Sequence, residues 1–418
     1  MTSTSIRERT GVATKLSESI RPFVGGELPV RLIAWDGSEA GPADAPTVRL
    51  QSPDALRRLL WHPGELGAAQ AYVTGEIDVD GDLSEALTYV WEVVGRRDLH
   101  AVRRTPATFL RLLAAAARVG GLGRPLPAPR TQAHIRGGLH TPARDRRAIS
   151  HHYDVPSAFY ELILDEQMAY SSAYFPEPPM SLEQAQRAKL ELICGTLGLR
   201  PGMRLLDVGC GWGSLSLHAA AEHGVHVTGV TISAEQKRFV DARITERGLG
   251  DLVDVRLQDY REVRDGDFDA AASVEMGEHV GQANYPTYVE MLRSNVRPGA
   301  PVLIQQMSRT SRPGGGPFIE SFIAPDMHMR PLGETVDLIE AGGLEVVGVQ
   351  SLRTDYVRTV ALWINRFEDN QDRLRAMVGE EMLRVWRLYL VGGMMAFRDG
   401  RMGVDQILSR RPERDRTT

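Results

Sequence analysis

Cysteine is almost missing from this chain. Its 418 residues include only Cys194 and Cys210, and both lie in apolar or glycine-rich surroundings. Disulfide-dependent secreted domains carry many more cysteines, and thiolate metal sites need several at short spacing. The sequence therefore indicates neither a disulfide framework nor a metal site, and it fits a reducing cytoplasm.

Long apolar runs are missing too. A membrane-spanning helix needs roughly 20 consecutive apolar residues, and no stretch approaches that length. Residues Met1–Val24 contain no apolar core of signal-peptide length. We therefore expect a cytoplasmic protein that associates only peripherally with the inner face of the cell membrane.

The chain also lacks an excess of positive charge, since its formal net charge is -5. Nucleic-acid binding relies on a basic face that contacts phosphates, so we expect no nucleic-acid partner. No repeat at a fixed period is visible either, which excludes solenoids and propellers.

What the chain does have is the composition of a globular protein, with 42% hydrophobic and 25% charged residues. Its length favours two domains. Short extended runs mix with helical patterns over residues 1–95, which predicts a small α+β domain. We place this lipid- or membrane-associated domain, with a basic linker, at residues 1–145 and a catalytic domain at residues 146–418.

Arginine concentrates between Arg96 and Arg147, a segment with twelve arginines and two aspartates. Within it, Arg104, Arg111 and Arg118 recur every seven residues, with apolar residues on another side of the helical pattern. Such a helix either packs on the core through its apolar stripe or is attracted to an anionic membrane surface, at roughly 1 kcal/mol per basic residue. We expect an anionic membrane surface as a partner and keep both alternatives open.

After Ser150 helical patterns alternate with strands, at residues 204–208, 225–230, 253–257 and 268–274. This alternation predicts an α/β domain with a mostly parallel, Rossmann-like sheet and helices on both faces. Ligands of such sheets bind beyond the carboxyl ends of the strands. We therefore expect the functional residues directly after the strands.

A glycine-rich turn, Asp207–Gly213, follows the first of these strands. Glycine lets the backbone turn sharply and approach a ligand without a Cβ in the way. The spacing is G-x-G-x-G, whereas dinucleotide sites have G-x-G-x-x-G and an acidic residue after the next strand, which here ends at Val230. A nicotinamide or flavin cofactor is disfavoured, and the turn is either a cofactor cradle or only a tight connection.

Several ordered motifs resemble those of class I S-adenosylmethionine (SAM) methyltransferases, specifically the cyclopropane-fatty-acyl-phospholipid synthase family. The resemblance spans residues 146–400. The motifs that carry it are Asp207–Gly213, Gly229–Gln236, Leu257–Tyr260, His151–Asp154, Met168–Phe175, Glu278–Gly281 and Asp355–Thr359.

The resemblance implies SAM as the cofactor. By matched position, Thr231 and Gln236 would hold the ribose, and Asp259 with Tyr260 would flank the adenine. Without the resemblance, Thr231 and Gln236 are equally explained as helix caps and Tyr170 as a core aromatic. The full set matched to the cofactor is Tyr170, Ser171, Gly209, Gly211, Thr231, Ile232, Gln236, Asp259, Tyr260 and Val274.

The implied reaction is methyl transfer to the double bond of an oleoyl-type chain on a membrane phospholipid. The enzyme must then stabilise a carbocation away from water and remove a proton. In the resembled family a bound bicarbonate takes that proton, held by a glutamate, a cysteine, a histidine, a backbone amide and a tyrosine. Glu278 and Tyr356 match the glutamate and the tyrosine, and His279 completes the Glu-His motif.

Three positions depart from that pattern. Ser172 replaces the cysteine, Gln305 replaces the histidine, and Glu275 stands where cyclopropane synthases usually have glycine. We hypothesise that Glu275 wholly or partly replaces bicarbonate as the base, because an apolar pocket raises the pKa of a carboxyl and a positioned base contributes roughly 10²- to 10⁴-fold. Alternatively, Glu275 binds the SAM amino group or caps the next helix.

The motifs Glu275–His279, Gln305–Met307 and Arg401–Gln406 look more like the branch that makes 10-methylene stearoyl lipids, precursors of tuberculostearic acid. The resemblance thus implies a 10-methylene product, with a cyclopropane ring of the same mass as the alternative. It also implies a reductase partner for the methylene product and a homo-oligomer.

Two other functions stay open. One is a SAM methyltransferase of a small soluble acceptor, which the N-terminal domain and the arginine-rich segment disfavour. The other is a catalytically silent module that binds lipid or SAM, which the presence of Glu278, His279 and Tyr356 disfavours.

Overall fold

The computed structural model describes residues 11–21, 24–97, 110, 113–114, 116–135, 137–153, 155–177, 179–310 and 313–413. The chain packs into two compact units, residues 1–132 with 380–391, and residues 133–379 with 392–418. The division by packing thus falls before the boundary that we place after residue 145, and a late segment of the chain joins the first unit.

The first unit combines helices with a small sheet. Its four strands lie in the order β2-β1-β3-β4, with β1 parallel to β3 and the other pairs antiparallel. Arg384, from the late segment, donates to the carbonyl oxygens of Tyr72 and Ile77 at 2.6 and 2.8 Å, which explains why that segment belongs here. The elements are α1 (Val12–Ile20), β1 (Arg31–Ile33), β2 (Glu39–Ala40), β3 (Thr47–Leu50), α2 (Asp54–Trp61), α3 (Glu65–Val73), β4 (Ile77–Val79) and α4 (Leu83–Arg96).

The arginine-rich segment is described only in part. Arg104 and Arg111 lie outside the described residues, as does Asp154 of the His151–Asp154 motif. In the described portion, Ala116 and Val119 are buried while Arg118 is exposed. At this end of the segment the apolar side packs on the core, as one of the two alternatives states.

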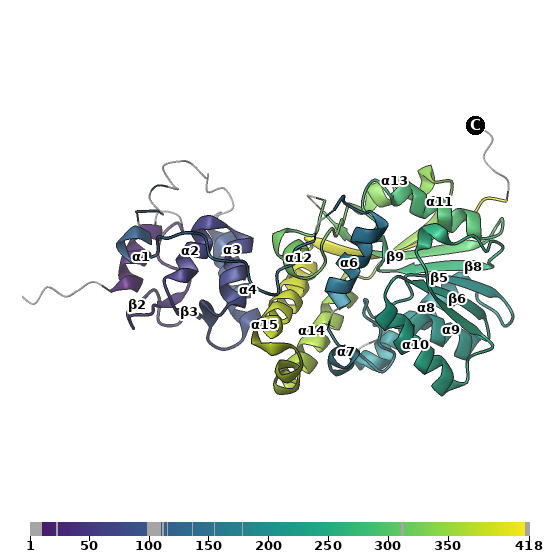
Figure 1. The fold of residues 1–418 in the computed structure, drawn as a ribbon, viewed down its shortest axis with the longest axis horizontal. Helices are drawn as coiled ribbons and strands as arrows, with labels where there is room; N and C mark the ends of the chain where they lie inside the picture. Colours follow the sequence, from purple (N-terminus) through teal and green to yellow (C-terminus); the bar gives the residue numbers. More distant parts are fainter. Residues whose placement is uncertain are drawn as a thin grey trace, which may run out of the picture. The chain divides into compact units, whose positions relative to one another are not determined.

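The second unit is built on a seven-stranded sheet in the order β10-β11-β9-β8-β5-β6-β7 (Figure 1). Neighbouring strands from β9 to β7 are parallel, and β11 runs antiparallel to both β9 and β10. The strands are β5 (Arg204–Val208), β6 (His226–Thr231), β7 (Val253–Leu257), β8 (Ala270–Val274), β9 (Pro301–Arg309), β10 (Glu345–Ser351) and β11 (Met402–Arg410).

Helices cover both faces of this sheet. One core joins α8, α9 and α10 to the strands, and a second core joins α11 and α13 to the opposite face. The helices are α6 (Pro142–Tyr153), α7 (Ser157–Ile163), α8 (Leu182–Leu197), α9 (Ser214–His223), α10 (Ala234–Arg247), α11 (Tyr285–Asn295), α12 (Pro317–Phe322), α13 (Leu332–Ala341), α14 (Arg353–Asp369) and α15 (Gln371–Arg398).

The predicted fold class is therefore confirmed. The four strands expected from the sequence are β5 to β8, with small differences at their ends. The chain order places β6 and β7 on one side of β5, and β8 and β9 on the other. This reversal at β5 creates the crevice in which sheets of this kind bind ligands.

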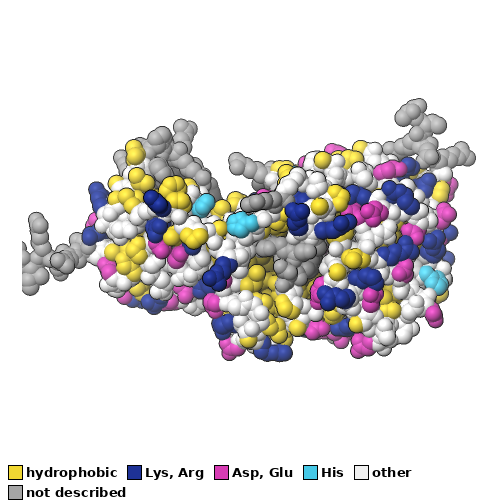
Figure 2. Space-filling model, in the orientation of Figure 1, with side chains coloured by type: hydrophobic (Ala, Val, Ile, Leu, Met, Phe, Trp, Pro, Cys, Tyr) yellow, Lys and Arg dark blue, Asp and Glu magenta, His cyan; other side chains and the backbone are white. Residues whose placement is uncertain are grey.

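The surface of the second unit is mixed in charge. Figure 2 shows basic and acidic side chains interspersed over its visible face. Among the described residues, no helix combines the length and the apolar character needed to cross a bilayer.

Candidate active site

A cavity lies at the carboxyl ends of β5, β6, β7 and β8, where the sequence predicts the functional residues. It encloses about 870 Å³ of empty space including its open mouth. It is lined by Asp145, Ala148, Gly209, Gly211, Val230, Thr231, Ile232, Gln236, Gln258, Asp259, Tyr260, Arg261, Glu275, Met276, His279, Val280, Pro325 and Asp326.

The cavity brings together most of the predicted site residues. Nine of them line it: Gly209, Gly211, Thr231, Ile232, Gln236, Asp259, Tyr260, Glu275 and His279. Five others are not part of the lining: Tyr170, Ser171, Val274, Glu278 and Tyr356. Val274 packs against the apolar core of the sheet. The roles assigned to all of them stay predictions.

The glycine-rich turn forms the floor of the cavity. Gly209 and Gly211 have φ angles of +77° and +54°, in the left-handed region that glycine adopts without strain. A Cβ on Gly209 would lie 2.7 Å from Cγ of Met276. Below the turn, the buried carboxyl of Asp207 accepts a hydrogen bond from Ser216 Oγ at 2.6 Å, and burial raises its pKa to about 6. The turn is therefore shaped for close approach of a ligand.

Thr231 and Gln236 are paired with each other. The Thr231 hydroxyl donates to Gln236 Oε1 at 2.7 Å, while the side chain that caps α10 is Ser233, which accepts from the Gln236 amide at 3.3 Å. The two residues are thus not caps themselves, and both face the cavity. This placement favours the ligand-binding alternative for the pair.

The far end of the cavity is closed by ion pairs. Arg261 donates to Asp259 at 2.7 and 2.8 Å and to Asp145 of α6 at 2.8 Å. Burial raises the pKa of Asp259, but the hydrogen bonds from Arg261 outweigh it and hold that pKa below its usual value. Arg144 also pairs with Asp326, at 2.5 and 2.8 Å. These contacts fix α6 at the rim, a role that the sequence did not reveal.

Ser171 is held by α8, and Tyr170 packs against α7. Lys189 is fully buried and donates to Ser171 Oγ at 2.9 Å, and Gln186 donates to the carbonyl oxygen of Ser171, also at 2.9 Å. Tyr170 packs edge-on against Tyr160, with ring centroids 5.5 Å apart. Lys189 is a site residue that sequence reasoning missed. The available signal was a charged residue on an otherwise apolar helix face.

Glu275 is the centre of the opposite end of the cavity. Its Oε1 accepts hydrogen bonds from the Ser172 backbone amide at 2.8 Å and from Gln305 Nε2 at 2.9 Å. Its Oε2 accepts from the Tyr356 hydroxyl at 2.8 Å. Burial raises the pKa of Glu275, and these donors, with the charge of Lys189, counteract the rise.

The backbone at Glu275 adopts φ +50°. A side chain in the left-handed region costs roughly 1–3 kcal/mol when the surroundings impose it, and such strain concentrates at functional sites. Gln406 Nε2 in turn donates to Gln305 Oε1 at 2.9 Å, so the Gln305 amide is oriented with its nitrogen toward the carboxylate. The structure thus devotes several groups to holding one carboxylate.

Glu278 differs sharply from its neighbour. It is fully buried, and among the described residues neither carboxyl oxygen has a hydrogen-bond partner of normal geometry. Burial, followed by the nearby charge of Glu275, raises the pKa of Glu278 to about 8. The buried guanidinium of Arg330 is the cation that partly offsets this rise. The pKa of both carboxyls is therefore raised, and Glu278 favours its protonated form at neutral pH.

Comparisons with known proteins identify the family of this chain. The chain matches the family model described as mycolic acid cyclopropane synthetase over residues 140–407. It is 38% identical to a probable fatty acid methyltransferase of Pseudomonas putida, over 93% of each chain. It is 33% identical to the tuberculostearic acid methyltransferase UfaA1 of Mycobacterium tuberculosis, over 91% of this chain and 87% of that one.

A solved structure of a cyclopropane synthase is also similar to this chain. The mycolic acid cyclopropane synthase CmaA1, complexed with S-adenosylhomocysteine (SAH) and CTAB, is 29% identical and superposes with a TM-score of 0.60. The match covers 63% of this chain and 98% of CmaA1.

Proposed function

Given that the chain belongs to the cyclopropane synthase family and is a SAM-dependent methyltransferase of lipid acyl chains, we propose a specific reaction for it. The methyl group is transferred to the double bond of an oleoyl-type chain on a membrane phospholipid, and loss of a proton then gives a 10-methylene chain. The alternative product is a cyclopropane ring at the same double bond.

The cavity fits the cofactor. Gly209 leaves room where a Cβ would collide with Met276, and the Thr231–Gln236 pair and Asp259 present polar groups along its wall. When bound, SAM supplies an electrophilic methyl group. The residues of the chain must then bind the acyl chain, exclude water and accept a proton.

The observation that carries the proposal is the carboxylate of Glu275 among the Ser172 amide, Gln305 and Tyr356. Ser172, Gln305 and Tyr356 are matched to positions that hold bicarbonate in the resembled family, so in this chain they hold a side-chain carboxylate instead. A raised pKa makes Glu275 a stronger base than an exposed carboxylate, and its negative charge stabilises a nearby cation. We infer that the reaction needs no bicarbonate.

The proposed steps conserve atoms and charge. Methyl transfer to one alkene carbon leaves the cation on the neighbouring carbon, and a hydride shift moves it to the carbon that bears the new methyl. Glu275 then removes a proton from that methyl group, which leaves an exocyclic alkene, and later releases the proton to solvent. The resemblance of Glu275–His279 and Gln305–Met307 to the branch that makes 10-methylene lipids favours this outcome over ring closure.

The proposal extends to the cellular setting. The arginine-rich segment would draw the cytoplasmic enzyme to the anionic inner face of the cell membrane, where its substrate lies. A reductase would saturate the methylene product, and the enzyme would act as a homo-oligomer.

The test is incubation of the purified protein with methyl-labelled SAM and oleoyl phospholipid vesicles, in buffer with and without bicarbonate, followed by proton NMR of the released acyl chains. We expect vinylidene protons and equal turnover in both buffers. Upfield ring protons would identify a cyclopropane synthase. If no label appeared in lipid, the result would favour a methyltransferase of a small soluble acceptor. If turnover depended on bicarbonate, Glu275 would not be the base.

A further inference from the structure

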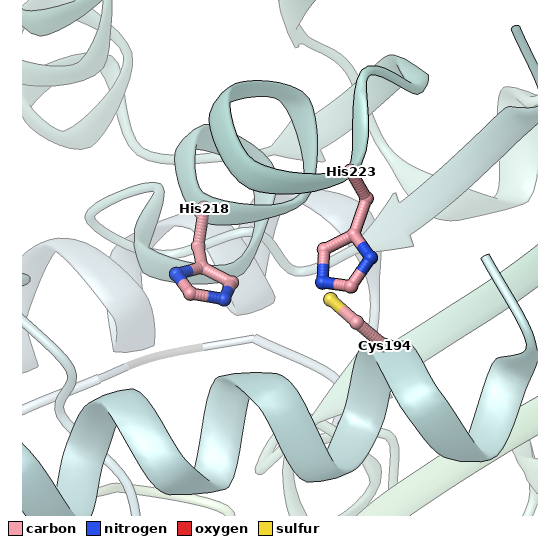
Figure 3. A group of neighbouring side chains, drawn as sticks. All are labelled: Cys194, His218 and His223. Carbon is pink, nitrogen blue, oxygen red and sulfur yellow. The ribbon is translucent and has the colours of Figure 1, made fainter. Parts of the chain in front are cut away.

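Side chains with metal-binding atoms meet between α8 and α9. Cys194 lies in the last turn of α8, and His218 and His223 lie on α9. One ligand atom from each of the three lies within 4.8 Å of the other two. Figure 3 shows the Cys194 sulfur directed at the ring of His223, with His218 beside it. None of these residues lines the cavity described above.

Glu191, one helical turn before Cys194, contacts both imidazoles and is the candidate for a fourth ligand. Its Oε1 lies 2.8 Å from His218 Nε2, and its Oε2 lies 3.1 Å from His223 Nε2. The two imidazoles therefore converge on one carboxylate, next to a thiol. A thiolate, two imidazoles and a carboxylate are all donors that Zn²⁺ accepts.

The spacing is close to that of a tetrahedral site. With Zn–N and Zn–O bonds of about 2.0 Å and a Zn–S bond of about 2.3 Å, neighbouring ligand atoms lie roughly 3.3–3.6 Å apart. The two contacts of Glu191, at 2.8 and 3.1 Å, are slightly shorter than this range. The Cys194 sulfur and the two imidazoles lie within 4.8 Å of one another, which is wider than this range by about an ångström.

The four side chains of this group differ in how far they are exposed to solvent. Cys194 and the His218 side chain are almost fully buried, whereas the side chains of His223 and Glu191 are 22% and 48% exposed. The sulfur is thus sealed from solvent, while one imidazole and the carboxylate leave a path for an ion to enter. A structural metal site has this arrangement, with all four positions filled by protein.

We propose that Cys194, His218, His223 and Glu191 form a structural zinc site. Binding releases the thiol proton to solvent and links the end of α8 to α9. These two helices flank β5 and the glycine-rich turn in the chain, because α8 precedes β5 and α9 begins directly after Gly213, and both pack in the same core. The metal would stabilise the segment that carries Gly209 and Gly211. This site is independent of the proposed methyl transfer.

The test measures metal in the full-length, untagged protein. After incubation with zinc and gel filtration, we expect about one equivalent of zinc per chain by elemental analysis, and at least a tenfold loss in Cys194→Ala and in His218→Ala. The control is His226→Gln, which changes an exposed histidine at the start of β6 and should keep the full zinc content. SAM binding by each variant monitors folding.

Cobalt gives a second readout that needs no variant of the site itself. The chain has only two cysteines, so Cys210→Ala leaves Cys194 as the sole thiolate, and Co²⁺ bound there should show sulfur-to-cobalt charge-transfer absorption. The proposal would be overturned if the protein bound no zinc after incubation with it and showed no such absorption after incubation with Co²⁺. Full zinc content in both Cys194→Ala and His218→Ala would overturn it as well.

Discussion

The two ends of the cavity are built in different ways. The cofactor end rests on short stretches of chain, since the turn after β5 and the Thr231–Gln236 pair are each local in sequence. The base end gathers Ser172, Glu275, Gln305 and Tyr356 from four separate segments around one carboxylate. The difference suggests that the cofactor end is a property of the fold, whereas the base end sets the chemistry of this chain.

The sharpest way to separate the two ends is Glu275→Gln. The amide keeps the shape but loses the charge and the proton affinity, so we expect kcat to fall by roughly 10²- to 10⁴-fold. The Kd for SAM should stay within about threefold, because the cofactor end is unchanged. Turnover assays and calorimetry on the same preparations check this. Near-normal turnover with near-normal SAM affinity would exclude Glu275 as the base.

A companion variant, Glu275→Gly, restores the residue of the resembled family and relieves the φ +50° backbone. We expect it to be inactive in bicarbonate-free buffer and to recover part of its turnover when bicarbonate is added, while Glu275→Gln shows no recovery. If adding bicarbonate changed the turnover of both variants equally, bicarbonate would not bind where the Glu275 carboxylate lies.

The converse change is Gly209→Ala at the cofactor end. The new Cβ would meet Met276 at 2.7 Å and force a side chain into φ +77°. Strain of roughly 1–3 kcal/mol should weaken SAM binding by about 5- to 150-fold, measured as the Kd by calorimetry. Gly250→Ala, at an open and unstrained position, is the control. Unchanged SAM affinity in Gly209→Ala would contradict the cradle interpretation.

A smaller effect is expected from Tyr356→Phe. Loss of one hydrogen bond of about 1 kcal/mol should lower kcat by about fivefold. Since the hydroxyl lowers the pKa of Glu275, its removal raises that pKa further. A base must be deprotonated, so the acidic limb of the kcat–pH profile should move to higher pH. A fall in kcat with an unmoved profile would assign Tyr356 to packing alone.

The last prediction concerns a different quantity, the stability of the folded chain, and the variant Glu278→Gln. The pKa of Glu278 is raised to about 8, so the folded state binds a proton that the unfolded state releases near its ordinary value. Wild-type stability should therefore fall as pH rises from about 4.5 to 8. The glutamine variant lacks this titrating group. The difference between its Tm and that of the wild type should therefore increase as the pH rises across this window. If the Tm of the two proteins changed with pH in parallel, the pKa of Glu278 would not be raised in the folded state.

The parts of the molecule that the sequence predicted are the local ones. The glycine-rich turn and the strands β5 to β8 follow from contiguous patterns. The identity of the α10 cap did not, because Ser233 and Thr231 are both cap formers two residues apart. The contact between Glu275 and its donors depended on the resemblance, since their separations of 30 to 103 residues carry no periodic signal.

Other features required the tertiary structure. Lys189 lies on an otherwise apolar helix face, but only the tertiary structure shows which group it contacts, the hydroxyl of Ser171. The segment 380–391 lies within the continuous helical pattern of α15, although the backbone leaves helical geometry at Gly379. Cys194 pairs with histidines 24 and 29 residues later, a spacing that matches none of the common zinc motifs.

The left-handed backbone at Glu275 also bears on how such a chain can arise. Codons for glycine and glutamate can differ by a single base, so one mutation can place a carboxylate where a glycine stood. The chain path there already has positive φ, and the rest of the strand need not move. If Glu275 is the base, as proposed, formation of the lipid product would not depend on the supply of dissolved carbon dioxide.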